Sequence, residues 1–142
     1  MVLYARDILE KEFVTVPPTT SVLEAAKQMR VSKKGFAVIG SHTRPEGIIT
    51  EWDILSKVVA EGSDPAAVKV QEIMTTELVY VKSDEGIAAI SQLMSEKGIR
   101  RILVKDGEDV VGYITSRTVL ANLNAYVDKV SSQISRLQAP WF

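Results

Sequence analysis

Thr50 and Asp53 are the polar residues best placed to do chemistry in this sequence. They open a predicted helix directly after a short apolar strand led by Gly47. The free N–H groups and the dipole of a helix N-terminus favour an anion such as phosphate, and the Thr50 hydroxyl can add a donor. The Asp53 carboxylate can accept hydrogen bonds from two neighbouring hydroxyl groups. The pair has a second interpretation as a helix cap, because threonine and aspartate are ordinary residues of a first turn.

Two adjacent arginines, Arg100 and Arg101, form the second candidate. They begin a predicted strand, and a guanidinium group offers donors in a fixed arrangement that matches two oxygens of a phosphate. Neighbouring residues of a strand point to opposite faces, so one of the two can simply face solvent. We expect at least one of them to contact an anion.

Residues that could support catalysis are scarce. The chain has no cysteine, and its one histidine, His42, lies in a polar loop. No grouping of acidic residues and histidine has the spacing of a metal site, no glycine-rich phosphate loop occurs, and no serine lies in a nucleophile-elbow pattern. The sequence therefore predicts a protein that is not an enzyme and that holds no metal or catalytic cofactor.

Composition narrows the class of protein further. The 142 residues are 46% apolar and 25% charged, with a formal net charge of −1, values that are ordinary for a soluble globular protein. The first residues lack the apolar core of a signal peptide, and no run approaches the roughly 20 residues of a membrane span. We expect a cytoplasmic protein without a membrane partner. The slight acidity and the lack of a recognition-helix pattern argue against nucleic acid as a partner.

The sequence repeats itself at an offset of 65 residues. Gly47-Ile48-Ile49-Thr50 returns as Gly112-Tyr113-Ile114-Thr115, and Val14-Thr15-Val16 returns as Val79-Tyr80-Val81. The apolar register needs no gap over residues 5–55. A unit of about 50 residues buries too little surface to be stable alone. The two halves are therefore expected to pack their sheets against each other, with clefts between them.

Each half is predicted to contain the order β-α-β-β-α, preceded by a short helix. Ser21 and Glu24 form a capping box at the first long helix, and Gly35 ends it. The sequence thus predicts an α/β (α+β) fold of two tandem units related by a pseudo-two-fold axis. The predicted strands are 13–16, 36–39, 47–49, 101–104 and 110–114, and the predicted later helices are 50–61 and one from Ser83 or Asp84 to Gly98.

These segments resemble the CBS-domain family, in two copies over roughly residues 3–122. The resemblance is carried by the lead-in segments 7–9 and 72–75, by the strands that follow Gly35 and Gly98, and by the two glycine-led strands. Gly47-Ile48-Ile49-Thr50-Glu51-Trp52-Asp53 fits the family pattern of glycine, two apolar residues, Thr or Ser, two variable residues and Asp. The resemblance implies a stand-alone pair of CBS repeats, a Bateman module, that senses AMP, ADP, ATP or a relative such as S-adenosylmethionine or NAD.

The resemblance also implies how an adenine nucleotide would be held in a cleft beside the Thr50–Asp53 turn. Asp53 is expected to accept the ribose hydroxyls, while Thr50 and the helix N-terminus hold phosphate. The other expected contacts are a guanidinium group from the other half and apolar groups around the adenine, supplied by Arg100 or Arg101 and by Val14, Ile48 and Val79.

The second copy departs from the family pattern. Thr115 is retained, but Thr118 occupies the position that corresponds to Asp53. A threonine accepts hydrogen bonds from ribose less well than a carboxylate does. We therefore expect one good nucleotide site and a second cleft, around Thr115, that is degenerate or empty.

The end of the chain predicts self-association. We divide the chain into a first repeat (1–64), a second repeat (65–122) and a C-terminal helix with its tail (123–142). Apolar residues recur there at alternating spacings of three and four, as in a coiled-coil seam; they are Leu120, Leu123, Val127, Val130, Ile134 and Leu137. We expect a homodimer through the CBS repeats and this helix, although the stripe could instead pack on its own domain. The two rings of the tail Ala139-Pro140-Trp141-Phe142 are expected to be docked.

Two functions remain open at this stage. The first is an adenine-nucleotide sensor that acts on a protein partner, which the sequence does not name. The second is a structural or protein-interaction CBS pair with no physiological nucleotide ligand.

Overall fold

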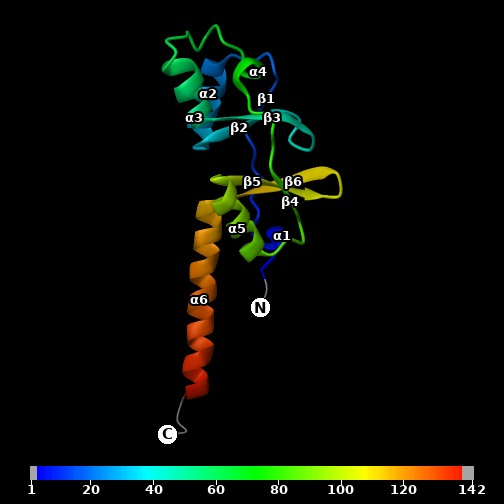
Figure 1. Ribbon diagram of the computed structural model, residues 1–142, viewed down its shortest axis with the longest axis vertical. Helices are drawn as coiled ribbons and strands as arrows, with labels where there is room; N and C mark the ends of the chain where they lie inside the picture. The colour runs from blue at the N-terminus through cyan, green and yellow to red at the C-terminus, as the bar shows by residue number, and fades with distance from the viewer. Residues whose placement is uncertain (1–2, 139–142) are drawn as a thin grey trace.

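The computed structural model describes residues 3–138, in which two three-stranded sheets lie one above the other (Figure 1). The strand order is β1-β2-β3 in the first sheet and β4-β5-β6 in the second. In each sheet the first strand is parallel to the second, and the second is antiparallel to the third. The two sheets thus share one topology, which confirms the predicted α+β fold of two tandem repeats with an added C-terminal helix.

The first repeat differs from the predicted elements mainly at their ends. The strand predicted over 13–16 is short, and the helix predicted over 50–61 is a single α-turn followed by a π-helix. Only one half of the predicted capping box is observed: the Ser21 Oγ accepts a hydrogen bond from the Glu24 N–H at 3.1 Å, while the Glu24 Oε1 accepts from the Gln28 side chain at 3.5 Å. The elements are α1 (Ala5–Ile8), β1 (Thr15–Val16), α2 (Val22–Ser32), β2 (Phe36–Gly40), β3 (Pro45–Thr50), α3 (Glu51–Ile54) and the π-helix η1 (Leu55–Val59).

The second repeat repeats this order with one clear correction. The helix expected to begin at Ser83 or Asp84 begins at Ile87, with Gly86 as its N-cap, because the preceding residues form a turn. Gly86 corresponds to Ser21 at the 65-residue offset but has no side chain to cap the helix. The elements are α4 (Val70–Ile73), β4 (Tyr80–Lys82), α5 (Ile87–Lys97), β5 (Arg101–Asp106), β6 (Asp109–Thr115) and α6 (Ser116–Gln138).

The short helices that lead into the repeats are exchanged between them. Helix α1 precedes the first repeat, but its Ala5 and Ile8 are buried in the core of the second, and the Ala5 N–H donates to the Glu85 carbonyl at 2.8 Å. Helix α4 precedes the second repeat, but its Val70 and Ile73 are buried in the core of the first. Each repeat is therefore completed by a segment of the other.

A shared core holds the two sheets together. Side chains from β2 of the first sheet and from β5 and β6 of the second meet in one buried cluster, which consists of Phe36, Val38, Leu103, Val110 and Tyr113. The Phe36 and Tyr113 rings pack edge to face with centroids 4.9 Å apart, a favourable arrangement of two aromatic rings. The expectation that each half packs its sheet against the other is confirmed.

Helix α6 begins against the second repeat and then leaves it (Figure 1). Leu120 is 61% exposed, Val127 58% and Ile134 47%. The alternative that this stripe packs on its own domain is therefore wrong for these residues. The docking expected for the tail falls on residues 139–142, which lie outside the described residues. The proposed boundaries at 64/65 and 122/123 remain predictions, although α6 runs unbroken across the second of them.

Candidate functional site

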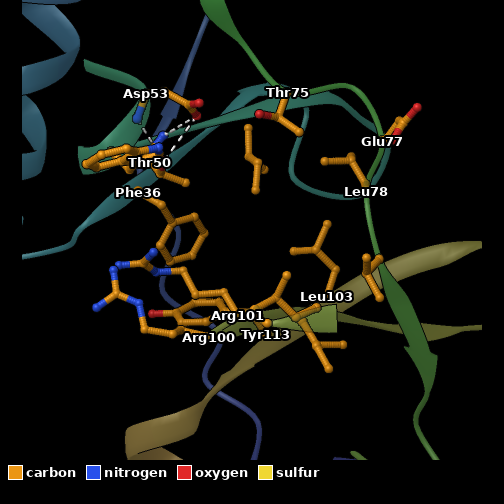
Figure 2. A pocket seen from close by; sticks show the side chains of 16 residues that line it. Phe36, Thr50, Asp53, Thr75, Glu77, Leu78, Arg100, Arg101, Leu103 and Tyr113 are labelled. Atoms are coloured by element: carbon orange, nitrogen blue, oxygen red, sulfur yellow. Dashed lines mark hydrogen bonds between the residues drawn. The ribbon is translucent and has the colours of Figure 1, made fainter. Parts of the chain in front are cut away.

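A cleft of about 330 Å³ opens where the two repeats meet, and we call it the first cleft (Figure 2). The first repeat contributes the end of β3 and the first turn of α3, while the second contributes the segment before β4 and the start of β5. Its lining residues are Phe36, Ile48, Thr50, Trp52, Asp53, Thr75, Glu77, Leu78, Val79, Gly98, Ile99, Arg100, Arg101, Ile102, Leu103 and Tyr113. A volume of this size lies at the lower end of the range for small-molecule sites.

Thr50 and Asp53 form a reciprocal cap at one wall of this cleft. The Thr50 N–H and hydroxyl both donate to Oδ2 of Asp53, at 3.0 and 3.1 Å, and the Asp53 N–H donates to the Thr50 Oγ1 at 3.2 Å. The helix-cap interpretation is therefore correct in this structure. It does not exclude the binding interpretation, because both residues also line the cleft.

Asp53 is the one charged residue among the buried residues of the described chain, with 6% of its surface exposed. Its second oxygen, Oδ1, lies 3.0 Å from the Lys57 Nζ, and that ammonium also donates to the Ile73 carbonyl at 2.9 Å. A carboxylate has about four acceptor positions. The cap and Lys57 use three, so one position is open, and a second opens if Lys57 moves away.

Arg101 reaches across from the second repeat to the first. Its guanidinium group donates to the Glu51 carboxylate at 3.2 Å and lies 5.4 Å from the centre of the Phe36 ring. Arg100 is exposed and lines the same cleft. Two positive groups therefore face the Thr50–Asp53 turn across the cleft, and the cation nearer the first repeat is already paired with an acid.

The structure places six of the eight expected site residues in the first cleft: Thr50, Asp53, Arg100, Arg101, Ile48 and Val79. Val14 does not line it and is buried in the core of the first repeat. Residues 75–79 pass the first cleft, and their counterparts at the 65-residue offset are residues 10–14. By the pseudo-two-fold relation, the lead-in segment of the first repeat passes the other cleft, which Glu10 lines. Thr115 also lines the other cleft.

Several lining residues were not predicted from the sequence, notably Phe36, Thr75, Glu77 and Tyr113. The Ile48 N–H donates to the Thr75 carbonyl at 3.0 Å, and the Thr75 N–H donates to the Ile48 carbonyl at 2.8 Å. This pair of bonds joins the lead-in of the second repeat to β3 of the first. A signal was available in the glycine-led strands, because a glycine in a strand often marks the close approach of another backbone.

The pseudo-symmetric partner, which we call the second cleft, has a different chemistry. The Thr118 hydroxyl lies 2.9 Å from that of Thr115 and donates to the Glu10 carboxylate at 3.3 Å. A carboxylate from the lead-in segment of the first repeat thus stands near the position where Thr118 replaces an aspartate. The full lining is Glu10, Lys33, Lys34, Gly35, Phe36, Arg101, Tyr113, Thr115, Arg117 and Thr118, so cations outnumber acids here.

Lys34 is held in its charged form in the second cleft. The nearby Tyr113 hydroxyl raises the pKa of Lys34 above its usual value, and the charges of Glu10 and Glu12 act in the same direction against a lowering by partial burial. The ammonium lies 5.8 Å from the centre of the Tyr113 ring. Lys34 therefore contributes a positive charge to the second cleft at neutral pH.

Within residues 3–138, no three acidic, histidine or cysteine side chains are grouped so that they could hold a metal ion. The same part of the chain contains no helix that is both long enough and apolar enough to cross a bilayer. The site thus consists of helix N-termini, hydroxyls, carboxylates and guanidinium groups beside apolar side chains. Such a set can bind an organic ligand that carries hydroxyl and anionic groups.

The fold and the site define a class of protein: a pair of α/β repeats that form composite clefts at their junction. The CBS domain model matches residues 5–60 and 70–125. The chain therefore belongs to the CBS domain family and contains two CBS domains.

Relatives and solved structures are similar to this chain over most of its length. An uncharacterized protein of Methanopyrus kandleri is 31% identical over 93% of this chain and 68% of its own. The hexameric CBS-CP12 protein from bloom-forming cyanobacteria is 34% identical, with a TM-score of 0.75 over 84% of this chain and 67% of its own. The CBS domain pair of the protein MJ0100, in complex with 5′-methylthioadenosine and S-adenosyl-L-methionine, is 29% identical. Its TM-score is 0.77, over 89% of this chain and 99% of its own.

Proposed function

We propose that this chain is a non-catalytic regulatory module that binds an adenine nucleotide, or a related adenosyl ligand, in the first cleft. The observation that carries the proposal is the Asp53 carboxylate, which is almost fully buried at the N-terminus of α3 and faces two arginines of the other repeat across an apolar cleft. A buried charge is costly to keep unless it is paired and hydrogen-bonded. Binding would report the level of the ligand to a partner protein.

Each part of the ligand has a counterpart in the first cleft. The open acceptor position of Asp53 suits a ribose hydroxyl, and a second hydroxyl can be accepted if Lys57 moves away. Arg100 and Arg101 suit phosphate or another anionic group. The adenine ring fits the apolar part of the lining, which includes Ile48 and Val79.

A relative supports this choice of ligand class. The MJ0100 CBS pair, which has the same fold at 29% identity, is described in complex with two adenosyl compounds. The two compounds are 5′-methylthioadenosine and S-adenosyl-L-methionine, so an adenosine moiety is their common feature. We extend that feature, and not the particular compound, to this chain.

The homodimer expected from the sequence also belongs to this proposal. A groove between α2 and the α3–η1 segment carries exposed apolar side chains, including Leu55 at 50% and Val59 at 60% exposure. Exposed apolar surface of this kind favours association. We propose that two copies associate through their repeats and through α6.

Calorimetry with AMP, ATP, S-adenosylmethionine and NAD tests the nucleotide site. We expect Asp53→Ala to weaken binding of the preferred ligand about tenfold to a hundredfold, because ribose hydroxyls lose their acceptor. The matched control is Thr118→Ala at the same repeat position, for which we expect little change. Thermal melting of both variants shows whether loss of the cap has unfolded the protein. Equal losses in the two variants would contradict a site confined to the first cleft.

A structural or protein-interaction module without a nucleotide ligand is the second candidate. The observation that favours it is that the charged groups of the site are already paired within the protein. Asp53 is bonded to Thr50 and Lys57, and Arg101 is bonded to Glu51. This candidate predicts that no compound in the calorimetric series binds. It also predicts that the purified protein carries no nucleotide detectable by mass spectrometry after denaturation.

A further inference from the structure

The free part of α6 is a surface that the nucleotide proposal does not use. Helix α6 contacts α5, β6 and α1 near its start, and Val119 is buried in the core of the second repeat. Beyond about residue 123 the helix stands clear of every other element (Figure 1). Its 23 residues correspond to a length of about 34 Å.

A free helical arm of this composition is poorly stable alone. The part beyond the body is about 15 residues long, a length at which isolated helices are marginal in water. It contains Ser131, Ser132 and Ser135, which are only moderate helix formers. Most helical stability in proteins comes from packing an apolar face, so this arm needs a partner surface.

We propose that the partner is the same arm of a second copy, and that the two α6 helices pair as a parallel, in-register coiled coil. This inference rests on the proposed homodimer and not on nucleotide binding. Exposed apolar residues occupy the a and d positions of the heptads: Leu120, Leu123, Val127 and Ile134 are 61%, 38%, 58% and 47% exposed, and Val130 is half-buried. A strict a/d repeat of this kind is a narrow seam for another helix.

The charge pattern supports pairing with an identical helix. From Leu120 onward, the charged residues of α6 are Asp128, Lys129 and Arg136, and all three fall on the outer b and c positions. The e and g positions beside the seam carry no charge; they are Asn124, Tyr126, Ser131, Gln133 and Gln138. Like charges at these positions would face each other in a homodimer and oppose it. In this sequence no such repulsion opposes the pairing of two identical helices.

Two further features favour the parallel orientation. The a positions Val127 and Ile134 are β-branched and the d position Leu123 is leucine, the combination that favours two parallel strands, although Leu120 and Val130 depart from it. The seam is also continuous with an apolar groove between α5 and the start of α6, which Leu120 and Leu123 line. A two-fold axis along the seam places this groove against its counterpart, so the second repeats of the two copies lie side by side.

Disulfide trapping tests the orientation, and the absence of cysteine from the chain makes each introduced thiol unique. Leu123→Cys and Ile134→Cys place thiols on the seam near its two ends. In a parallel, in-register pair, each variant alone forms a disulfide-linked dimer under mild oxidation, because the two copies of the residue face each other within disulfide range. The control Ser132→Cys lies on the outer f position, and we expect it to remain a monomer on a non-reducing gel.

The other results overturn the inference in distinguishable ways. Cross-linking only in a mixture of Leu123→Cys and Ile134→Cys shows an antiparallel pair. Cross-linking of Ser132→Cys as fast as the seam variants shows random collision. Light scattering of Val127→Asp plus Ile134→Asp gives an independent reading, for which we expect the dimer dissociation constant to rise at least about tenfold. An unchanged constant means that the repeats alone form the dimer, so the arm inference fails while the homodimer stands.

Discussion

At the residue scale, the carboxylate of Glu51 competes with an anionic ligand of the first cleft for the Arg101 guanidinium group. The Arg101 guanidinium is paired with the Glu51 carboxylate at 3.2 Å, and the arginine side chain is 20% exposed while that of the glutamate is 65% exposed. A phosphate bound at Arg101 must therefore displace or tolerate Glu51. An ion pair with one exposed member is weak, about 0–1 kcal/mol, so displacement by a doubly charged phosphate is feasible.

The Glu51→Gln variant measures this competition. We expect it to raise the affinity for AMP or ATP about twofold to fivefold, since it removes a charge that repels phosphate and occupies Arg101. Adenosine, which has no phosphate, should bind with unchanged affinity. Calorimetry with the three ligands gives the comparison, and Arg101→Gln is the matched control with the opposite expected sign. A parallel change for adenosine and AMP would show that Glu51 acts on the fold of the cleft and not on its charge.

At the scale of elements, Gly47 in β3 and Gly112 in β6 leave room for the lead-in segment of the other repeat to pass close to each strand. A Cβ atom on Gly47 would lie 2.7 Å from the Met74 Sδ and 2.9 Å from the Thr75 carbonyl oxygen, and one on Gly112 would lie 2.6 Å from the Glu10 carbonyl oxygen. Neither residue has a positive φ. The requirement is therefore close backbone approach and not an unusual backbone conformation.

Replacement of these glycines should destabilise the fold. We expect Gly47→Ala and Gly112→Ala to lower the free energy of unfolding by about 1–3 kcal/mol each, because the methyl group forces two backbones apart. Chemical denaturation measures the effect. The control is Gly86→Ser, since a Cβ there meets nothing within 4 Å. A serine at this N-cap should raise the free energy of unfolding by a few tenths of a kcal/mol. A loss at Gly86 as large as that at Gly47 would show that the crossing is not the cause.

The elements themselves could be predicted from the sequence, but their exchange between repeats could not. The 65-residue repeat and the apolar alternation identify the strands, the long helices and the sheet-to-sheet packing. They do not show which repeat receives α1 or α4, because both repeats offer the same kind of apolar surface to a short amphipathic turn. The start of α5 was predicted too early for a local reason, since Ser83 and Asp84 suit a turn as well as a cap.

Sequence patterns are local, and this also explains which residues of the site could be predicted. Thr50 and Asp53 are close in the chain and follow a pattern, so the sequence identifies them. Arg101 was found as a strand residue, but its partner Glu51 lies 50 positions away, and no local pattern encodes that pairing. Val14 does not line the first cleft, because it is equivalent to Val79 in the other repeat and each lead-in segment passes only one of the two clefts.

At the scale of the whole molecule, the two repeats are expected to behave as one cooperative unit. Three features join them: the exchanged helices α1 and α4, the crossing of residues 10 and 75 over the opposite third strands, and the buried cluster between the sheets. Separation of the repeats would expose all of this surface and leave two cores incomplete. A ligand bound between the repeats therefore stabilises both of them, by mass action on the single folded state.

A substitution in one repeat with a reporter in the other tests this cooperativity. Leu103 belongs to the second repeat, is 5% exposed and lies in the cluster between the sheets, so Leu103→Ala should lower the free energy of unfolding by about 2–4 kcal/mol. Trp52 belongs to the first repeat, and a Trp141→Phe background makes it the sole tryptophan. We expect the denaturation midpoint of Trp52 fluorescence to fall by the same amount as the midpoint of far-ultraviolet circular dichroism, at one fixed protein concentration, as a two-state transition requires. A fluorescence midpoint that stays at its original value while the dichroism midpoint falls would mean that the first repeat unfolds independently. In that case the first cleft, which both repeats line, would be lost when the second repeat unfolds, and a ligand bound there would stabilise only the state in which both repeats are folded.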